Sequence, residues 1–334
     1  MTNSSKSTEE ILNVAIDDGY AQTKAIGPDG NITCFLTSVR PGRHAKSSMD
    51  GQVVSGFYET NGGVYVVDAE VGGEDTRYDG YHGSELNRIA VHHALHELGL
   101  AGRKVSLVVG MPLQEFFDDH GKPNSDAIAA KKKSLLEPVV YRRDNDATSV
   151  DVVAVTVISQ GVAAYLDFLI DDDGGQREEA DGPIVVVDIG GRTTDIAHLS
   201  DYNTLEHNRS GTTNTGVLDV AAALKPDLVA RCKILPAEAK ESVLDNAIRT
   251  GETLQFGRPV KCADLVASAA EGPKRTLERT LRNKLGSGAF ARKVLFVGGG
   301  TNVFRGLAEM FPHSVIVDDP EYANVRGMRK FQAI

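Results

Sequence analysis

Two short turns, each opened by an aspartate at the end of an apolar run, constrain the fold of this chain most. The first follows Ile11–Ile16 and begins Asp17-Asp-Gly19, and the second follows Pro183–Val187 and begins Asp188-Ile-Gly-Gly191. The two leading aspartates are 188 − 17 = 171 residues apart, about half of the 334 residues. A chain of this length corresponds to about two domains. We therefore predict an α/β fold in which one architectural unit is used twice.

The hydrophobic pattern predicts where each unit begins and ends. An acidic, glycine-rich segment over 171–182 is the best candidate for the boundary between the units. We expect a polar, disordered tail over 1–10, a first unit over 11–170 and a second over 183–319. Within the first unit, Gly-rich residues 39–83 predict a small β-containing insertion. Helices are expected at about 84–98, 124–136, 160–170 and 320–334, the last returning to the first unit.

Composition excludes several classes of protein. The chain has 36 Lys plus Arg and 46 Asp plus Glu, so its formal charge is −10, which argues against direct, tight DNA binding. No apolar run approaches the roughly 20 residues of a membrane span, and the first ten residues lack the apolar region of a secretory signal. The three cysteines form no C-x-x-C pair, which favours reduced thiols. We expect a cytoplasmic protein with no membrane partner.

A third turn, residues 297–302, adds a run of glycines, Val297-Gly-Gly-Gly300. We call residues 17–24 the first turn and residues 188–195 the second turn. Glycine lets a backbone approach a ligand closely, and successive amide groups in such turns form concave sites for phosphate oxygens. A single Asp-Gly turn is more often only a tight connection. Three such turns, each at the end of an apolar strand, predict a phosphate-binding site.

The polar residues of the turns have the chemistry that such a site needs. Asp17 and Asp188 could hold a hydrated Mg²⁺, which prefers carboxylate, water and phosphate oxygens. Lys24, Thr193 and Thr194 supply donors to phosphates. Better-known motifs are absent: the sequence has no Walker-type G-x-x-x-x-G-K-[ST] and no G-x-S-x-G elbow.

Taken in order, the motifs resemble those of the actin-like ATPase superfamily, which actin, sugar kinases and heat-shock chaperones share. Within it, the likeness is closer to the ParM/StbA family of plasmid-segregation actins, and it spans about residues 11–330. The matching segments are Ile16-Asp-Asp-Gly19 with Lys24, Ala90-Val-His-His-Ala-Leu95, Met111-Pro-Leu-Gln-Glu-Phe-Phe-Asp118, Lys122-Pro-Asn124 with Lys131-Lys132, Asp188-Ile-Gly-Gly191 and Val297-Gly-Gly-Gly300.

This resemblance implies an actin-like fold, with two RNase H-like domains around an interdomain nucleotide cleft. It implies ATP with Mg²⁺ as cofactors, although GTP remains open. It makes Gln160 and Asp188 the catalytic residues, and Asp17 and Asp188 the metal site, through water. The nucleotide-binding residues that it implies are Asp17, Gly19, Tyr20, Ala21, Lys24, Gly190, Gly191, Arg192, Thr193, Thr194, Gly216, Gly298, Gly299, Gly300 and Asn302.

Two positions depart from the family pattern. Actin-like ATPases usually have a Glu or Gln that orients the attacking water, and Gln160 is our choice here; a shift by one residue would put Ser159 there instead. Arg192 stands where the second turn usually has a small residue. It could contact a phosphate or point to solvent.

By resemblance, the chain is expected to polymerise head-to-tail with Mg-ATP, to hydrolyse it, and to segregate plasmid DNA through a DNA-bound adaptor of the ParR type. DNA contact would then be indirect, in agreement with the acidic charge. Two other functions stay open. One is a small-molecule kinase on the same fold, with Asp195 as the candidate catalytic residue. The other is a nucleotide-dependent scaffold that does not polymerise.

Overall fold

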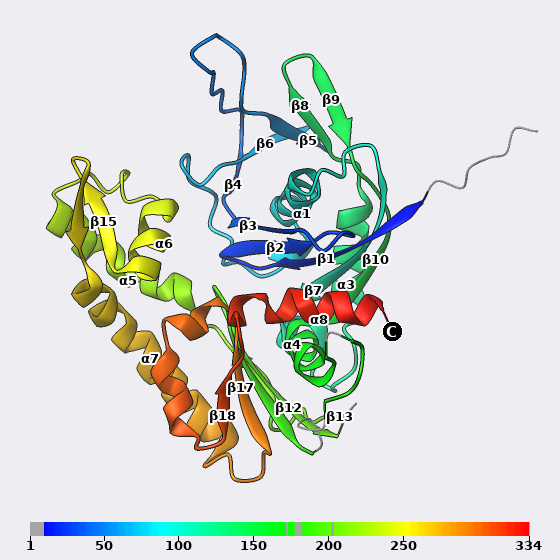
Figure 1. Ribbon diagram of the computed structural model, residues 1–334, viewed down its shortest axis with the longest axis vertical. Helices are drawn as coiled ribbons and strands as arrows, with labels where there is room; N and C mark the ends of the chain where they lie inside the picture. The colour runs from blue at the N-terminus through cyan, green and yellow to red at the C-terminus, as the bar shows by residue number, and fades with distance from the viewer. Residues whose placement is uncertain (1–9, 172, 178–181, 202–203, 334) are drawn as a thin grey trace, which may run out of the picture.

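Two large sheets face each other across a pair of helices in the computed structural model (Figure 1). The structure describes residues 10–171, 173–177, 182–201 and 204–333. Nearly all of the expected tail and part of the acidic 171–182 segment lie outside these residues. We call 10–171 the first half and 182–333 the second half.

Helices account for much of the described chain, and none of those it contains has both the length and the apolar content needed to cross a bilayer. The α-helices are α1 (Glu85–Glu97), α2 (Leu113–Phe116), α3 (Ser125–Leu136), α4 (Gln160–Leu169), α5 (Val217–Cys232), α6 (Glu241–Thr250), α7 (Ala263–Leu285) and α8 (Ala323–Gln332). Short 3-10 helices span Tyr81–Gly83, Gly299–Asn302, Arg305–Met310 and Pro320–Tyr322.

The first half contains a five-stranded mixed sheet in the order β10-β7-β1-β2-β3. Its strands are β1 (Ile11–Asp18), β2 (Gln22–Ile26), β3 (Ile32–Leu36), β7 (Lys104–Met111) and β10 (Asp151–Ser159). Strand β1 pairs parallel with β7 and antiparallel with β2, β7 pairs parallel with β10, and β2 pairs antiparallel with β3.

The second half repeats this arrangement. Read in the matching direction, its order is β18-β17-β11-β12-β13, and β14 pairs with β12. Its strands are β11 (Ile184–Ile189), β12 (Thr194–Asp201), β13 (Thr204–Leu205), β14 (Gly211–Thr213), β17 (Lys293–Val297) and β18 (Ser314–Ile316). Strand β11 pairs antiparallel with β12 and parallel with β17, as β1 does with β2 and β7. The prediction of one α/β unit used twice is confirmed by this shared strand order.

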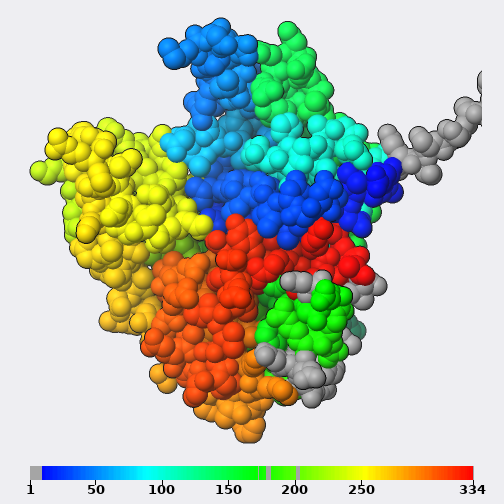
Figure 2. Space-filling model, in the orientation of Figure 1, coloured from blue at the N-terminus to red at the C-terminus, as the bar shows by residue number. Residues whose placement is uncertain are grey.

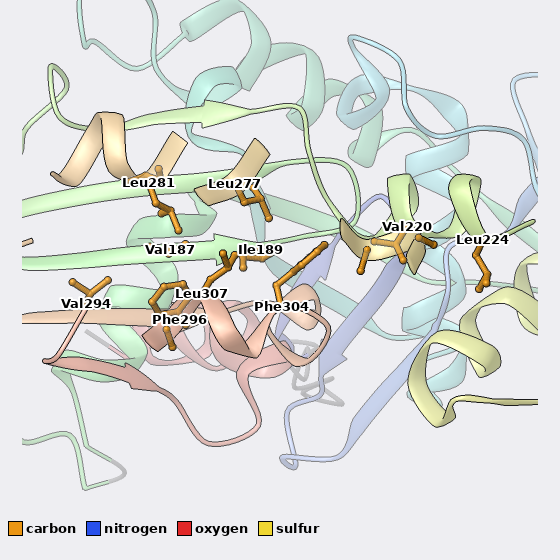
Figure 3. Close-up of a cluster of buried hydrophobic side chains, with 14 of the residues drawn as sticks. Val187, Ile189, Val220, Leu224, Leu277, Leu281, Val294, Phe296, Phe304 and Leu307 are labelled. Atoms are coloured by element: carbon orange, nitrogen blue, oxygen red, sulfur yellow. The ribbon is translucent and has the colours of Figure 1, made fainter. Parts of the chain in front are cut away.

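The core of the second half explains why β11 is so apolar. Every residue of β11 is buried, as expected for a central strand covered on both faces. Val187 of this strand belongs to a cluster with Val220 and Leu224 from α5 and Leu277 and Leu281 from α7 (Figure 3). Because these helices pack on the strand, the turn that follows β11 begins from a rigid base.

A third sheet of five strands, in the order β4-β6-β5-β8-β9, projects from the first half (Figures 1 and 2). Strands β4 (Val39–Pro41), β5 (Phe57–Thr60) and β6 (Gly63–Val67) lie within 39–83, where the sequence predicts an insertion. Strands β8 (Val140–Arg143) and β9 (Asp146–Ser149) were not predicted. All four residues of β9 are exposed, so that strand has no apolar alternation to reveal it.

Helices α4 and α8 pack against each other between the two large sheets, and α8 also contacts β1 and β7. A Cβ on Gly327 would lie 1.7 Å from the carbonyl oxygen of Ala163, so only glycine permits this close approach. Arg326 and Lys330 of α8 each donate a hydrogen bond to Asp167 of α4, at 2.8 and 2.9 Å. The chain's last helix is thereby fixed beside the first sheet.

A buried ion pair ties the first turn to the helices around it. Lys131 Nζ on α3 donates to Asp18 Oδ2 at 2.5 Å and to the Gly110 carbonyl at 2.6 Å, and neither charged side chain is exposed. Asn87 Nδ2 on α1 donates to the same carboxylate at 2.7 Å. Asp18 therefore serves the core of the first half, whereas its neighbour Asp17 lines a cavity.

Removal of one partner of this pair should strongly destabilise the fold. Lys131→Met leaves the Asp18 carboxylate buried without its cation, so we expect the free energy of unfolding to fall by about 3–5 kcal/mol. Urea denaturation followed by circular dichroism measures this change. Lys133→Met, two residues away and exposed, is the control and should change stability by at most about 0.5 kcal/mol. Equal midpoints for both variants would contradict this account of the pair.

Candidate functional site

A cavity of about 490 Å³ opens where β1, β11 and β17 end. The three turns and the start of α4 meet around it. Most of the site residues expected from the sequence line it: Asp17, Gly19, Tyr20, Ala21, Lys24, Gln160, Asp188, Gly190, Gly191, Thr193, Gly298, Gly299, Gly300 and Asn302. Arg192, Thr194 and Gly216 are not among the lining residues.

The first turn is held in one conformation by hydrogen bonds to its carbonyl groups. Thr37 Oγ1 donates to the Gly19 carbonyl at 2.9 Å, and the Thr37 amide donates to the Ala21 carbonyl at 2.9 Å. Thr76 Oγ1 donates to the Tyr20 carbonyl at 2.8 Å. These bonds occupy the oxygens that would otherwise repel an anion.

The N-terminus of α5 supports the second turn. The amides of Val217 and Leu218 donate to the carbonyls of Gly190 and Gly191 at 3.1 and 2.9 Å. A Cβ on Gly216 would lie 2.3 Å from the Gly191 carbonyl oxygen, so glycine at this position lets α5 begin close to the second turn. Gly216 therefore supports the turn and does not line the cavity. The positive end of a 16-residue helix adds a field that favours an anion here.

Thr194 has a similar supporting role. Its side chain is buried, and its hydroxyl donates to the Thr215 carbonyl at 2.8 Å. The two turns also contact each other directly, because a Cβ on Gly191 would lie 2.6 Å from Ala21 Cβ. The cavity is thus bounded by matching turns from the two halves.

Strand register places four ionisable groups at equivalent points of the two sheets. Asp17 on β1 is the cross-strand partner of Lys24 on β2, and Asp188 on β11 is the partner of Asp195 on β12. All four side chains are buried and line the cavity. Within the described residues, Lys24 Nζ makes no hydrogen bond or ion pair, so its donors are available to a ligand.

Burial shifts the pKa of all three aspartates upward. Burial raises the pKa of Asp188 to about 7; a hydrogen bond from Asn324 opposes the shift, and the carboxylates of Asp195 and Asp17 add to it. Burial also raises the pKa of Asp195 to about 6. The pKa of Asp17 rises for the same reason, partly offset by Lys24. The ligand-free cavity is therefore short of positive charge.

A divalent cation would supply that charge. In the described part of the chain, no three His, Cys, Asp or Glu side chains converge tightly enough to coordinate a metal by themselves. Asp17 and Asp188, buried on opposite walls of the cavity, instead fit a Mg²⁺ that keeps water and phosphate oxygens among its ligands. Burial is the main cause of their raised pKa values, and a cation bound beside them would oppose that shift.

Gln160, the first residue of α4, contacts the Asp17 carboxylate. Its Nε2 donates to Asp17 Oδ1 at 2.9 Å, which leaves its Oε1 free to accept a hydrogen bond from water. Gly110 makes room for this side chain, since a Cβ there would lie 2.7 Å from Gln160 Cγ. Ser159 is buried and does not line the cavity. Of the two candidates, Gln160 lines the cavity and Ser159 does not.

The third turn packs tightly against the end of β11. Gly298 has φ 84°, and a Cβ there would lie 2.3 Å from Asp188 Oδ1. A Cβ on Gly300 would lie 2.4 Å from Ile189 Cγ2. The run of glycines is therefore required for this turn to reach the cavity beside Asp188.

Sequence reasoning missed one wall of the cavity. Apolar Ile248 and Val303 line it together with Asp245, Arg305 and a pair between Arg249 and Glu321, whose atoms lie 3.1 Å apart. Most of these residues come from α6 and from the segment after the third turn, and no local motif marks them. Only the helical periodicity of 241–250 could have pointed to this wall.

Comparisons with known proteins agree with this geometry. Residues 12–170 match the family model described as plasmid segregation protein ParM, N-terminal, and residues 186–309 match the model described as archaeal actin homologue MreB-like, C-terminal. The two matches cover both halves of the chain, and the chain has an actin-like fold. Its expected fold is confirmed by the same comparisons.

Relatives of this actin-like protein match it over nearly its whole length. An archaeal actin homologue from Thermoplasma acidophilum is 26% identical over 335 residues, which cover 95% of this chain and 97% of the relative. The crystal structure of an archaeal actin homologue in complex with ADP has a TM-score of 0.74 at 22% identity, covering 97% of this chain and 99% of that one. A 15-stranded ParM filament from Clostridium botulinum has a TM-score of 0.70 at 19% identity, with the same coverage.

The raised pKa of Asp188 predicts a measurable cost to the stability of this actin-like protein. Between the ordinary carboxyl pKa near 4 and the folded value of about 7, the folded state keeps a proton that the unfolded state has lost. Stability therefore falls as the pH rises through that window. Asp188→Asn removes this titration, so the variant should be more stable than the wild type by roughly 4 kcal/mol at pH 7.5.

Urea denaturation of both proteins between pH 4 and pH 8 measures this difference, which should shrink towards zero at pH 4. Asp227→Asn, at an exposed position of α5, is the control and should not change the pH dependence. Parallel stability curves for Asp188→Asn and the wild type would show that Asp188 titrates normally.

Proposed function

We propose that this actin-like protein binds and hydrolyses Mg-ATP in the cavity and assembles into filaments while ATP is bound. One observation carries the proposal: two equivalent turns, each suited to anions, meet over buried aspartates from both halves of the chain. The ADP complex of the archaeal actin homologue supports a nucleotide as the ligand. The ParM filament supports self-association.

In this proposal, the phosphates lie between the first and second turns, near Lys24 and Thr193. Asp17 and Asp188 would hold the hydrated Mg²⁺, which would supply positive charge beside the phosphates. The ribose and base lie against residues 298–302, where Ile248 and Val303 offer apolar contacts to a planar ring. The wall of the cavity that includes Ile248 and Val303 is thus the proposed pocket for the base.

Gln160 is proposed to orient the water that attacks the terminal phosphate. Its Nε2 is engaged by Asp17, so its Oε1 accepts a hydrogen bond from that water and directs the oxygen lone pair towards phosphorus. A neutral amide positions water without removing its proton, so hydrolysis is expected to be slow relative to assembly.

Phosphates bound to both turns would link the two halves of the chain. Loss of the terminal phosphate on hydrolysis would weaken that link and let the halves separate. A closed form that contacts the next copy through two different surfaces makes an open, heterologous assembly. We further propose that the filament moves plasmid DNA through a DNA-bound adaptor of the ParR type. The net charge of −10 favours such an indirect contact with DNA.

We further propose that a neighbouring copy contacts two exposed aromatic residues of the second half. Phe256 is 89% exposed at the tip of the hairpin of β15 (Glu252–Gln255) and β16 (Arg258–Lys261), with φ 49°, a conformation that bulky residues rarely adopt. Phe290 is 80% exposed in the connection after α7. Helix α7, with 23 residues and a length of about 34 Å, lies between these two residues in the sequence. The helix and the β15–β16 hairpin before it are seen in Figure 1.

Light scattering tests the nucleotide dependence of assembly. With Mg²⁺ and ATP, scattering should rise and then decay as ATP is consumed, whereas ADP should give no rise. Gln160→Ala should assemble similarly but lose about 100-fold in hydrolysis rate, since a poorly oriented attacking water can cost that much, so its signal should persist. Binding of nucleotide with no rise under any condition would contradict filament assembly. Consumption of ATP only after an added acceptor would favour the kinase alternative.

Mixing two variants tests the proposed contact surfaces. Phe256→Asp and Phe290→Asp should each abolish assembly, because a charge would be buried in the contact between copies. Mixed in equal amounts with Mg-ATP, they should form a dimer and no polymer, since each retains one intact surface. Light scattering and analytical ultracentrifugation measure both results. Met49→Asp, at another exposed apolar position, should polymerise normally. Normal filaments from either single variant would remove that residue from the contact.

A further inference from the structure

We propose that Arg192 is a positioning residue that clamps the second turn to the first half of the chain and slows the exchange of bound nucleotide. The inference rests on the proposed function for the identity of the ligand. It addresses a residue that departs from the family pattern and does not line the cavity.

The guanidinium of Arg192 reaches across from the second turn to three groups of the first half. Its Nη1 donates to the Tyr78 carbonyl at 2.9 Å and to the Tyr20 hydroxyl at 3.4 Å. Its Nη2 donates to Asp79 Oδ1 at 2.7 Å. The guanidinium carbon also lies 5.3 Å from the centre of the Tyr20 ring, within the range of a cation–π contact. Every one of these contacts joins the two halves.

Tyr20, whose hydroxyl and ring both contact Arg192, is itself fixed by other side chains of the first half. Its hydroxyl donates to Glu115 Oε1 at 2.5 Å, and His82 Nδ1 lies 3.0 Å from the other oxygen of that carboxylate. Burial opposes ionisation of Glu115, but the hydrogen bonds from His82 and Tyr20 lower its pKa to about 2, so it accepts both bonds as a carboxylate. The Tyr20 ring also packs against Tyr81, with the ring centres 5.1 Å apart. Arg192 therefore contacts a tyrosine whose own position is fixed.

The position of Arg192 in the repeated fold explains why its contacts would control the cavity. Arg192 is the fourth residue after Asp188, and Ala21 is the fourth after Asp17. Gly191, its neighbour, touches Ala21 at the place where the two turns meet. The turns cannot separate to let a ligand leave unless the contacts of Arg192 break. The two turns are thus fastened beside the phosphate site by a side chain that only the second turn has.

The contacts of Arg192 differ in strength. Asp79 is 98% exposed, and ion pairs at such positions contribute little. The Arg192 side chain is only 14% exposed, so its bonds to Tyr78 and Tyr20 are partly shielded from water. We therefore expect Tyr20 and Tyr78, and not Asp79, to carry most of the clamp.

Dissociation rates distinguish a clamp from a phosphate ligand. A clamp slows the departure of any molecule in the cavity, whereas a phosphate ligand slows only molecules that carry phosphate. The experiment displaces fluorescent ADP and a fluorescent adenosine from the protein in a stopped-flow instrument. Arg192→Ala should raise the dissociation rate of both about tenfold, as expected for loss of charged hydrogen bonds. Faster release of ADP alone would show instead that Arg192 binds phosphate.

Matched variants locate the effect. Asp79→Asn should change either rate less than about twofold, because its carboxylate is exposed. Arg192→Lys, which keeps the charge but not the paired donors, should lie between Arg192→Ala and the wild type. Tyr20→Phe removes the hydroxyl and keeps the ring, so adding Arg192→Ala to it should accelerate release less than it does in the wild type. Unchanged rates in Arg192→Ala would overturn the clamp.

A measurement without nucleotide separates this proposal from the proposed function. Small-angle X-ray scattering of the ligand-free protein should give a larger radius of gyration for Arg192→Ala than for the wild type and Asp79→Asn. If the wild type bound no nucleotide, the proposed function would fail while this difference still tested the contact between the halves. Equal radii for all three proteins would show that Arg192 does not hold the halves together.

Discussion

The burial of three aspartates where two equivalent turns meet is the constraint on which the rest of the site depends. Asp17, Asp188 and Asp195 lie there because strand register puts them at the ends of central strands that cannot shift without exposing their apolar residues. Their raised pKa values mean that folding leaves the carboxylates poorly compensated. The fold thus accepts a loss of stability that a bound cation and its phosphates would offset, which couples ligand binding to the joining of the two halves.

The two copies of the repeated unit differ in the side chains at equivalent positions of their turns. At the position across from the leading aspartate, the first turn has Lys24 and the second has Asp195. Four residues after that aspartate, the first turn has Ala21 and the second has Arg192. Lysine and aspartate set the charge on the two walls of the cavity, and the arginine joins the walls outside it. Equivalent backbones therefore carry different chemistry at matched points.

The sequence was sufficient to predict the doubled unit and most of the cavity lining, because apolar strands that end in Asp and Gly leave a strong local pattern. It could not predict the partners of Arg192, since Tyr20 and Tyr78 approach it only through the contact between the halves. It missed β8 and β9, and all four residues of β9 are exposed and lack apolar alternation. It also missed Ile248, which lines the cavity from a helix without a motif. The partners of Arg192 and the place of Ile248 depend on tertiary contacts, whereas the missed strands have too weak a local pattern.

The most direct test of the account is the proton balance of nucleotide binding. Isothermal titration with ATP already saturated with Mg²⁺, at pH 7 in two buffers of different ionisation enthalpy, measures protons released per site. Because the pKa of Asp188 is about 7 in the ligand-free protein and should fall beside the cation, the account predicts release of about half a proton at this pH. Binding with the same apparent enthalpy in both buffers, or binding equally tight without Mg²⁺, would contradict it.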